Sequence, residues 1–441
     1  MRRDTFLLRV CVLLLATSCG RDKDTPDAQA LQKAAQAPFV QEALPEHIRA
    51  WETAVVLETS GHVRRFSEDR APVTVEGKWG FIDRTGRVVI PPQFDWACAF
   101  REGRAAVNVG GRCDAVGIVR GGKWGCIDTS GAVVVKPQFE WVDPFSEGLA
   151  RVQTTGVKLF ITEGERPDLG SRWQFIDLSG RTVIPGPFKW AESFSDGLSA
   201  VLFADKWGYV DRTGRTVVGP LFRDAGSFHE GLARVKDDNG WTYVDRSGKT
   251  LPGTCLDDAG DFSEGLAAVK VGVKWGYIDT KGTLVVKPSF DRVRPFSEGY
   301  ARVRLDGRWG FVDRTGAVVV PAKFESAFEF HGGLAAVAAG DRRLRLDEDG
   351  KPAVGTLWGF VDPSGRMVIP GRFAAVGDFH EGLAAVRQDG HWGYIDTAGT
   401  LVVPAAFDEA FAFSNGLARV HLGDRTGYID KSGSTVWTPT K

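Results

Sequence analysis

The chain has 441 residues, of which 54 are Gly and 14 are Trp, and its formal net charge is -1. Glycine is well above the usual share of about 7%, and it lacks the period of three that collagen requires. Hydrophobic residues make up 43% of the chain, which argues against a disordered protein. The 55 basic residues balance 56 acidic ones, so the sequence predicts no nucleic-acid partner. Frequent Gly together with frequent Trp instead predicts a repeat protein.

The first residues have the order of an export signal. Arg2 and Arg3 precede an apolar run at 6–16, and small residues then lead into Cys19. The run is shorter than the roughly 20 residues that cross a bilayer as a helix. The pattern resembles a bacterial lipoprotein signal, and an ordinary secretory signal is the alternative. The resemblance implies a signal peptide at 1–18, a lipid on Cys19 as the only membrane attachment and, because Gly20 follows instead of Asp, an outer-membrane location.

Residues 19–60 are expected to form a polar tether. This segment is polar and then alanine-rich, and Pro38 and Pro45 interrupt it. A short helix is expected from Pro45 towards Val56. Such a spacer would hold a folded body away from a lipid surface.

One sequence unit recurs through residues 61–441. Its lead residue is Trp in nine copies and Thr426 in the tenth; Asp follows at the fourth position after it and Gly at the seventh in every copy. The structural residues of this repeat are exemplified by Trp79, Trp124, Trp207, Trp275, Trp309, Trp358, Trp392, Asp83, Asp279 and Gly282. Repeats of 20–50 residues are typical of solenoids, propellers and arrays.

The unit is predicted to be all-β. Each copy has three short runs rich in aromatic and β-branched residues, separated by turns such as Asp-x-Ser/Thr-Gly. Short turns between neighbouring runs require antiparallel pairing. We therefore expect about ten antiparallel three-stranded hairpin repeats. An open solenoid or superhelix is the favoured arrangement, because ten units exceed the usual 4–8 blades of a propeller, and a closed propeller-like ring is the alternative.

Length changes between copies fall in one connection only. The three expansions lie at 108–123, 153–172 and 338–357, each between the third run and the next lead Trp. Insertions at one place in a repeat map to one face of the array, which is often the binding face.

The stretches Gly77-Lys78-Trp79-Gly80 and Gly122-Lys123-Trp124-Gly125 resemble the WG (KWG) repeat family. Repeats three and five depart from its pattern, with Gln174 and Thr242 in place of the second Gly. The resemblance implies a β-rich repeat scaffold on cell-envelope or secreted proteins, and it implies no catalytic residues.

The sequence predicts no enzyme, cofactor or metal site. Each repeated Asp offers one carboxylate, whereas calcium takes 6–8 oxygen ligands. A repeated Glu in Phe-x-Glu-Gly recurs too regularly for an active site, and His229, His331 and His380 share one turn slot. Recognisable hydrolase and phosphate-binding motifs do not occur. A disulfide between Cys113 and either Cys98 or Cys126 and free buried thiols remain alternatives.

Three further tryptophans are the candidate interaction residues. Trp96, Trp141 and Trp190 share a slot in the first three repeats only, beside two of the expansions. They form either a local aromatic patch for glycan or protein, or edge packing. The main hypothesis is a non-catalytic envelope lipoprotein whose repeats act as a protein-interaction scaffold. The alternative is a carbohydrate- or peptidoglycan-binding module, and a hydrolase is the least favoured.

Overall fold

The structure is a computed structural model, and it describes residues 66–113, 119–155, 172–253, 255–339, 345–346, 352–353, 357–423 and 425–438. The predicted signal peptide, Cys19 and the tether lie outside these residues. The chain divides into two compact units, 1–43 with 342–355 and 44–341 with 356–441. The described part of the first unit is the antiparallel pair β29 (Arg345–Leu346) and β30 (Pro352–Ala353). In the described ranges, no helix has the length and apolarity needed to cross a bilayer.

The described residues of the second unit form ten antiparallel sheets, here called blades 1 to 10 in chain order. Blades 1 to 3 are β1 (Ala71–Val75), β2 (Lys78–Ile82), β3 (Val88–Phe94); β4 (Trp96–Ala97), β5 (Arg104–Cys113), β6 (Val119–Asp128), β7 (Val133–Phe139); and β8 (Trp141–Val142), β9 (Leu149–Thr155), β10 (Arg172–Asp177), β11 (Thr182–Phe188). Blades 4 to 6 are β12 (Trp190–Ala191), β13 (Leu198–Leu202), β14 (Trp207–Asp211), β15 (Thr216–Phe222); β16 (Asp224–Ala225), β17 (Leu232–Lys236), β18 (Trp241–Asp245); and β19 (Asp258–Ser263), β20 (Leu266–Val271), β21 (Lys274–Asp279), β22 (Leu284–Phe290).

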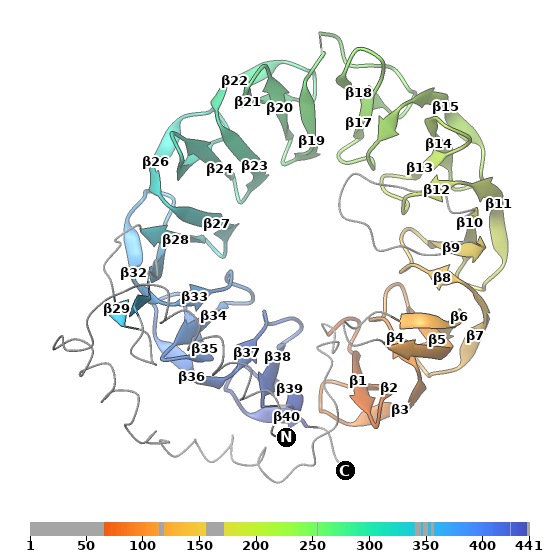
Figure 1. Ribbon diagram of the computed structural model, residues 1–441, viewed down its shortest axis with the longest axis horizontal. Coiled ribbons are helices and arrows are strands. Elements are labelled where there is room, and N and C mark those ends of the chain that lie inside the picture. The colour runs from red at the N-terminus through yellow and green to blue at the C-terminus, as the bar shows by residue number, and fades with distance from the viewer. Residues whose placement is uncertain are drawn as a thin grey trace, which may run out of the picture. The chain divides into compact units, whose positions relative to one another are not determined.

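Blades 7 to 10 continue the same pattern. Their strands are β23 (Arg292–Ser297), β24 (Tyr300–Leu305), β25 (Arg308–Asp313), β26 (Val318–Phe324); β27 (Ser326–His331), β28 (Leu334–Ala339), β31 (Leu357–Val361), β32 (Met367–Phe373); β33 (Ala375–Val376), β34 (Leu383–Gln388), β35 (His391–Asp396), β36 (Leu401–Phe407); and β37 (Glu409–Ala410), β38 (Leu417–Leu422), β39 (Arg425–Asp430), β40 (Thr435–Trp437). We name the four strands of a full blade A to D in chain order, with A on the inner side of the ring and D outermost (Figure 1). The described strands of blade 1, β1 to β3, are B to D, and those of blade 5, β16 to β18, are A to C.

Two kinds of turn reverse the chain at one end of each blade. Between strands C and D, the Asp carboxylate accepts backbone N–H bonds; Asp83 Oδ1 binds the N atoms of Thr85 and Arg87 at 2.9 and 3.1 Å. Gly86 closes this turn at φ 80°. Between strands A and B, a Glu-Gly pair such as Glu102-Gly103 takes φ 53° and 72°, as a tight primed hairpin turn requires. Left-handed backbone at a non-glycine residue is uncommon, so these Glu positions must be held by their surroundings.

In most blades the Gly of the Trp-Gly pair lies where strand D comes close to strand C. The C–D pairing jumps from Trp79↔Phe94 to Phe81↔Ile90, which leaves a bulge in strand D. A Cβ atom at Gly80 would lie 2.5 Å from Ile90 O, so a side chain does not fit there. The same close approach recurs in other blades, for example at Gly310. The pair is therefore conserved between copies because two backbones meet at this point.

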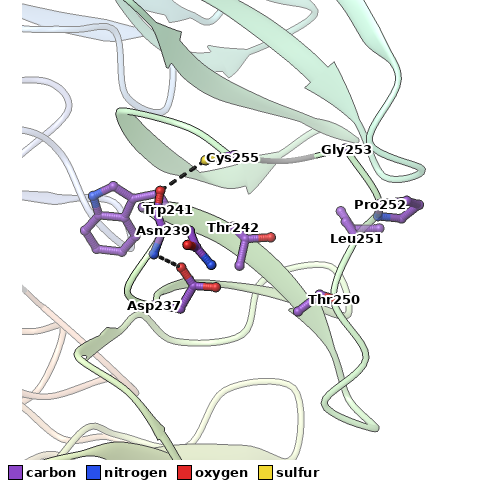
Figure 2. Close-up of a pocket in the computed structure, with 10 residues that line it drawn as sticks. Asp237, Asn239, Trp241, Thr242, Thr250, Leu251, Pro252, Gly253 and Cys255 are labelled. Atoms are coloured by element: carbon purple, nitrogen blue, oxygen red, sulfur yellow. Dashed lines mark hydrogen bonds between the residues drawn. The ribbon is translucent and has the colours of Figure 1, made fainter.

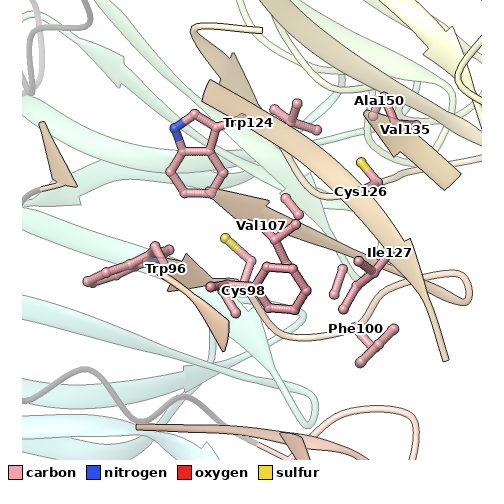
Figure 3. Packing of buried hydrophobic residues seen from close by; sticks show 14 of the residues in the cluster. Trp96, Cys98, Phe100, Val107, Trp124, Cys126, Ile127, Val135 and Ala150 are labelled. Carbon is pink, nitrogen blue, oxygen red and sulfur yellow. The ribbon is translucent and has the colours of Figure 1, made fainter. Parts of the chain in front are cut away.

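The core lies between successive blades, and aromatic side chains from strand C of one blade meet strand A of the next. The Trp79–Trp96 and Phe81–Phe100 rings make this contact between blades 1 and 2, with centroids 5.0 and 4.8 Å apart. Figure 3 shows the same buried cluster around Trp96, Phe100 and Trp124, all at most 4% exposed. Cys98 and Cys126 belong to the same cluster, and burial raises the pKa of the Cys126 thiol to about 12. The side chain of Cys113 lies outside the described residues.

The prediction of an open array of three-stranded units is wrong, and the alternative of a closed ring fits. Residues of blade 1 and blade 10 share one buried cluster, in which the Phe66 and Tyr428 rings lie 5.6 Å apart. The Ser414 hydroxyl donates a hydrogen bond to Phe66 O at 3.2 Å across the same junction. β1 and β40 belong to different sheets, so the ends meet by packing. The prediction of an all-β protein is confirmed.

The predicted number of about ten units agrees with the ten blades. The predicted number of three strands per unit is too low, for a physical reason. Strand A is often only two residues long, as in β4 and β8, and it follows strand D without a turn signal. The sequence unit beginning at a lead Trp therefore covers strands C and D of one blade and strands A and B of the next.

Candidate functional site

One face of the ring, formed by the A–B and C–D turns, is cross-linked between blades. The carboxylate of an A–B turn accepts N–H bonds from the A–B turn of the next blade; Glu102 Oε1 and Oε2 bind the N atoms of Glu147 and Gly148, both at 2.8 Å. Lys431 Nζ also donates to Glu381 O at 2.9 Å, joining a C–D turn to the preceding blade. These repeated Glu residues are therefore structural, which accounts for their regular recurrence.

A hydroxyl ladder runs beside the carboxylates. Ser195 Oγ donates to Phe228 O at 2.6 Å, and Ser297 Oγ donates to Phe330 O at 2.8 Å. Where His replaces Ser, the contacts differ. The rings of His331 and His380 stack with centroids 5.6 Å apart, and burial raises the pKa of neighbouring Asp378. The described residues contain no group of three or more His, Cys, Asp or Glu side chains able to hold a metal ion.

The opposite face, formed by the B–C and D–A connections, is where the copies differ. All three expansions lie in B–C connections, and in the first of them β5 and β6 extend to ten residues each. Val271 and Val273 of the blade 6 hairpin are 48% and 80% exposed. The exposed apolar residues that begin several D strands, such as Val133 and Val318, lie beside the C–D turns on the first face and repeat from blade to blade.

Blade 5 is the irregular copy, and its sequence explains why. Thr242 stands where the regular unit has Gly, but blade 3 has Gln174 there and still forms strand D, so this departure alone does not displace the strand. Pro252 stands where regular blades have a buried Ile or Val paired with strand C, such as Ile184 opposite Phe175. Pro252 has no N–H to donate to a ladder. The chain after β18 makes only single bridges, Val244↔Thr250 and Trp241↔Leu256, and no fourth strand forms in this described part of the blade.

A pocket of about 560 Å³ results where the outer strand is displaced. Figure 2 shows Thr242 between the B–C turn and the segment 250–255. Asp237 Oδ1 accepts the N–H of Asn239 at 2.7 Å, and the exposed thiol of Cys255 donates to Asn239 O at 3.0 Å. The pocket thus combines an apolar wall with amide, hydroxyl and carboxylate groups. The sequence signals for it are Thr242 and Pro252, and their place in the pairing of strands C and D became visible only with the structure.

The candidate interaction residues Trp96, Trp141 and Trp190 lie at junctions between blades. Their rings pack on the lead Trp of the preceding blade, with centroid separations of 5.0, 4.5 and 5.4 Å. Trp96 is only 4% exposed, while the other two are half-buried. This geometry corresponds to the edge-packing alternative for Trp96.

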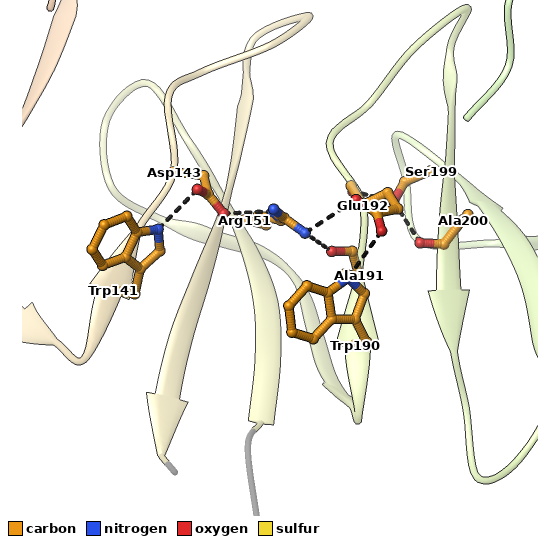
Figure 4. Close-up of polar contacts among 8 residues, drawn as sticks. All are labelled: Trp141, Asp143, Arg151, Trp190, Ala191, Glu192, Ser199 and Ala200. Atoms are coloured by element: carbon orange, nitrogen blue, oxygen red, sulfur yellow. Dashed lines mark hydrogen bonds and ion pairs between the residues drawn. The ribbon is translucent and has the colours of Figure 1, made fainter. Parts of the chain in front are cut away.

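Arg151 organises the junction between blades 3 and 4. Its Nε lies 2.5 Å from Asp143 Oδ2, and its Nη1 lies 3.4 Å from Glu192 Oε2 (Figure 4). The indoles of Trp141 and Trp190 donate to the same two carboxylates at 2.8 and 3.0 Å. The two half-buried tryptophans are thereby tied to a charge network inside the ring wall.

The structural residues named from the sequence occupy equivalent places. Each lead Trp, from Trp79 and Trp124 to Trp207, Trp275, Trp309, Trp358 and Trp392, belongs to strand C. Asp279 Oδ1 accepts N–H bonds from Lys281 and Thr283 at 2.9 and 2.8 Å. Gly282 follows in the same turn at φ 83°.

The repeat described as WG containing repeat matches nine segments of the chain. They are residues 79–113, 124–156, 173–207, 207–241, 256–275, 275–309, 309–341, 358–391 and 392–425. A comparison with curated proteins gives no match.

Three solved structures illustrate the likeness to known folds. A eukaryotic initiation factor aligns with TM-score 0.42 and 11% identity, over 71% of this chain and 88% of that chain. Hsv2p of Kluyveromyces lactis aligns with TM-score 0.32 and 10% identity, over 57% and 96%. PorZ, a surface component of the type-IX secretion system of Porphyromonas gingivalis, aligns with TM-score 0.26 and 10% identity, over 88% and 60%. All three scores are below 0.5, so none of these likenesses supports a functional argument.

Proposed function

Because the chain belongs to the WG containing repeat family and its repeats close into a ten-bladed propeller, we propose that it is a non-catalytic scaffold that binds a protein partner through the B–C and D–A face. A scaffold needs many similar copies to build the ring and a few different positions to recognise a partner.

The observation that carries this proposal is the contrast between the two faces. On the A–B and C–D face, the turn carboxylates and hydroxyls are engaged in bonds between blades, such as Glu264 Oε2 with Gly299 N at 2.9 Å. The other face carries the extended β5–β6 pair, the blade 5 pocket and the exposed Val271 and Val273. The two features are close, because Asp257, two residues after Cys255, accepts the N–H of Gly272 at 2.6 Å. Exposed apolar side chains at variable loops are typical of interaction sites.

Site-specific photo-cross-linking tests this proposal in cells that express the protein. A photoreactive amino acid at Val273, which is 80% exposed, should give a discrete protein adduct. The same group at Lys281, an exposed turn residue on the opposite face of the same blade, is the matched control. Absence of an adduct at Val273, or equal adducts at both positions, would contradict the proposal.

Carbohydrate binding is the second candidate, and the blade 5 pocket is the observation that favours it. Hydroxyl, amide and carboxylate groups beside an apolar wall are typical of sugar sites. Thr242→Gly together with Pro252→Ile should restore strand D, fill the pocket and slow alkylation of the exposed Cys255 thiol. If the pocket holds glycan, the same change should abolish retention on purified peptidoglycan. Retention that is absent in the wild type, or lost only on mutating Trp96, Trp141 and Trp190, would exclude the pocket.

The reverse change in a regular blade is the control for this reasoning. A Cβ at Gly208 would lie 2.6 Å from Val218 O, so Gly208→Thr should disrupt strand D of blade 4. We expect a loss of about 2 kcal/mol or more in the free energy of unfolding, measured by urea denaturation. An unchanged stability would refute the close approach of strand D at the Gly position.

For the location of the scaffold, we propose export and attachment to the cell envelope through a lipid on Cys19, most simply at the outer membrane. The supporting pattern is the charged, apolar and small-residue order of residues 2–19. Mass spectrometry of the mature N-terminus should find a diacylglyceryl group on Cys19. An uncleaved or unmodified end would refute the lipid anchor.

A further inference from the structure

Four positions on the inner two strands of a blade form a set that we call the inner quartet. They are the first residue of strand A, the residue two positions after it, and the third and fifth residues of strand B. In blade 7 all four are arginine, namely Arg292, Arg294, Arg302 and Arg304. No other blade has more than two basic residues at these positions.

The four arginines lie close together by strand register. Arg292 and Arg304 are direct Cα partners in the antiparallel pair β23–β24. Directly opposite residues have Cβ atoms about 5 Å apart, and like charges there are destabilising. Arg294 in turn lowers the pKa of Arg302, although burial is the larger cause. A purely structural role for these four residues does not explain why arginines that repel one another occupy all four positions.

Neighbouring aromatic groups hold the quartet in place. The guanidinium carbons of Arg302 and Arg304 lie 4.5 and 5.9 Å from the Trp309 ring centroid. The Tyr277 hydroxyl donates to the backbone O of Arg294 at 2.7 Å. Stacked guanidinium groups are pre-organised and weakly hydrated, which favours bidentate binding of carboxylate or phosphate.

The protein's own carboxylates balance only part of this charge. Glu329 Oε1 accepts a bond from Arg302 Nη2 at 3.0 Å, whereas nearby Asp291 binds Lys274 at 2.6 Å. Within the described ranges, no ion pair joins Arg292, Arg294 or Arg304 to a carboxylate. The Nε atom of Arg304 is buried and has no hydrogen-bond partner in that part of the chain.

Blade 3 indicates which anion fits. There the third residue of the set, Arg151, is held by the carboxylates of Asp143 and Glu192. Arg294 stands in blade 7 at the place that Asp143 has in blade 3, so a carboxylate that blade 3 supplies internally is missing.

We propose that the inner quartet of blade 7 is an anion-binding site that takes aspartate or glutamate side chains from an acidic segment of a protein partner. This inference rests on the proposed scaffold function and adds the chemistry of the partner. Arg292 and Arg294 are exposed and make first contact, while Arg304 supplies the buried donor. Two or more carboxylates are needed to balance the three arginines without an internal partner.

Fluorescence anisotropy of the full chain with a labelled deca-glutamate peptide tests the proposal. The wild type should bind the peptide, and raising the salt concentration should weaken binding. The double variant Arg292→Gln and Arg294→Gln should weaken it at least tenfold. Arg294→Asp should also abolish binding, and because it recreates the blade 3 pair with Arg302 it is not expected to unfold the protein. Arg87→Gln, which changes an exposed arginine of the C–D turn in blade 1, is the matched control and should bind as the wild type does.

The outcomes separate clearly. No binding by the wild type, or equal binding by the wild type and both quartet variants, overturns the site. Competition by pyrophosphate at lower concentration than by deca-glutamate overturns the carboxylate partner and assigns the site to phosphate. Because these measurements use purified protein and a peptide, their failure would leave the cross-linking result at Val273 unaffected, so the two proposals fail independently.

Discussion

Blades 3 and 7 have the same strand framework, but they differ in how the arginine at the third position of the inner quartet is neutralised. In blade 3, Arg151 is neutralised inside the ring by Asp143 and Glu192. In blade 7, Arg302 has one carboxylate partner, Glu329, and Arg294 takes the position of the missing second acid.

The packing beneath the two sets is alike. The ring pair Phe175–Phe194 has a centroid distance of 5.0 Å, and the equivalent pair Phe311–Phe330 has 4.8 Å. The comparison teaches that core and inner-strand charges vary independently in this repeat. A charge set can therefore change in one blade without altering the framework.

Removing Arg151 is the most disruptive way to test this comparison. Arg151 and Asp143 side chains are 16% and 14% exposed, so Arg151→Ala leaves two poorly solvated carboxylates without their cation. We expect a loss of about 2–3 kcal/mol in the free energy of unfolding, measured by urea denaturation.

The control for this change is Arg181→Ala. Arg181 is 79% exposed and pairs with Asp177 at 3.2 Å on the surface of the same blade. A change within about 0.5 kcal/mol is expected there. Equal effects of the two substitutions would mean that blade 3 does not depend on its internal network.

Converting blade 7 to the blade 3 arrangement should have the opposite sign. Arg294→Asp removes one positive charge from the quartet and places a carboxylate beside Arg302. We expect a gain of about 0.5–1 kcal/mol, because Arg294 is exposed and the new pair is partly screened. Raising the salt concentration should stabilise the wild type more than the variant, since salt screens the repulsion. A destabilised variant would show that the arginines are required by the fold.

The smallest effect concerns a feature that both blades share. The turn carboxylates Asp177 and Asp313 have pKa values below the usual 3.8, chiefly because the hydroxyls of Ser179 and Thr315 donate to them. A lowered folded-state pKa contributes stability that is complete well above pH 3.8 and is lost as the pH falls towards the folded value.

Urea midpoints at about pH 6 and pH 3 measure this contribution. Asp177→Asn and Asp313→Asn should each reduce the difference between the two midpoints slightly, and Asp177→Asn somewhat more, because Arg181 also donates to Asp177. An unchanged difference in both variants would show that the turn carboxylates do not contribute to the pH dependence of stability.

The sequence predicted the β character and the repeat well, because turn chemistry is local. The Asp and Gly of each C–D turn lie within four residues, and their spacing alone indicates the reversal. Ring closure was not predictable in this way. It depends on Phe66 meeting Tyr428, residues more than 300 positions apart, whose contact is decided by the accumulated angle between blades.

The candidate site was predicted only in part. The face with the expansions followed from the one variable connection, and Thr242 was visible as a departure from the repeat. The inner quartet was not found, because Arg292 and Arg304 become neighbours only when strand A is recognised. The Glu-Gly ladder was missed for a similar reason, since a carboxylate such as Glu298 binds backbone N–H groups one repeat away, at Gly332 and Gly333.

The offset between sequence unit and blade has a consequence for how such rings grow. A duplicated segment from one lead Trp to the next carries strands C and D of one blade and strands A and B of the following one. Its insertion leaves every existing blade complete and adds one more, so a single duplication yields a larger ring with no exposed half-blade. The number of blades can then change by one in each duplication. A duplicated segment that began and ended at blade boundaries would instead have both of its ends in the short connection between strand D and strand A.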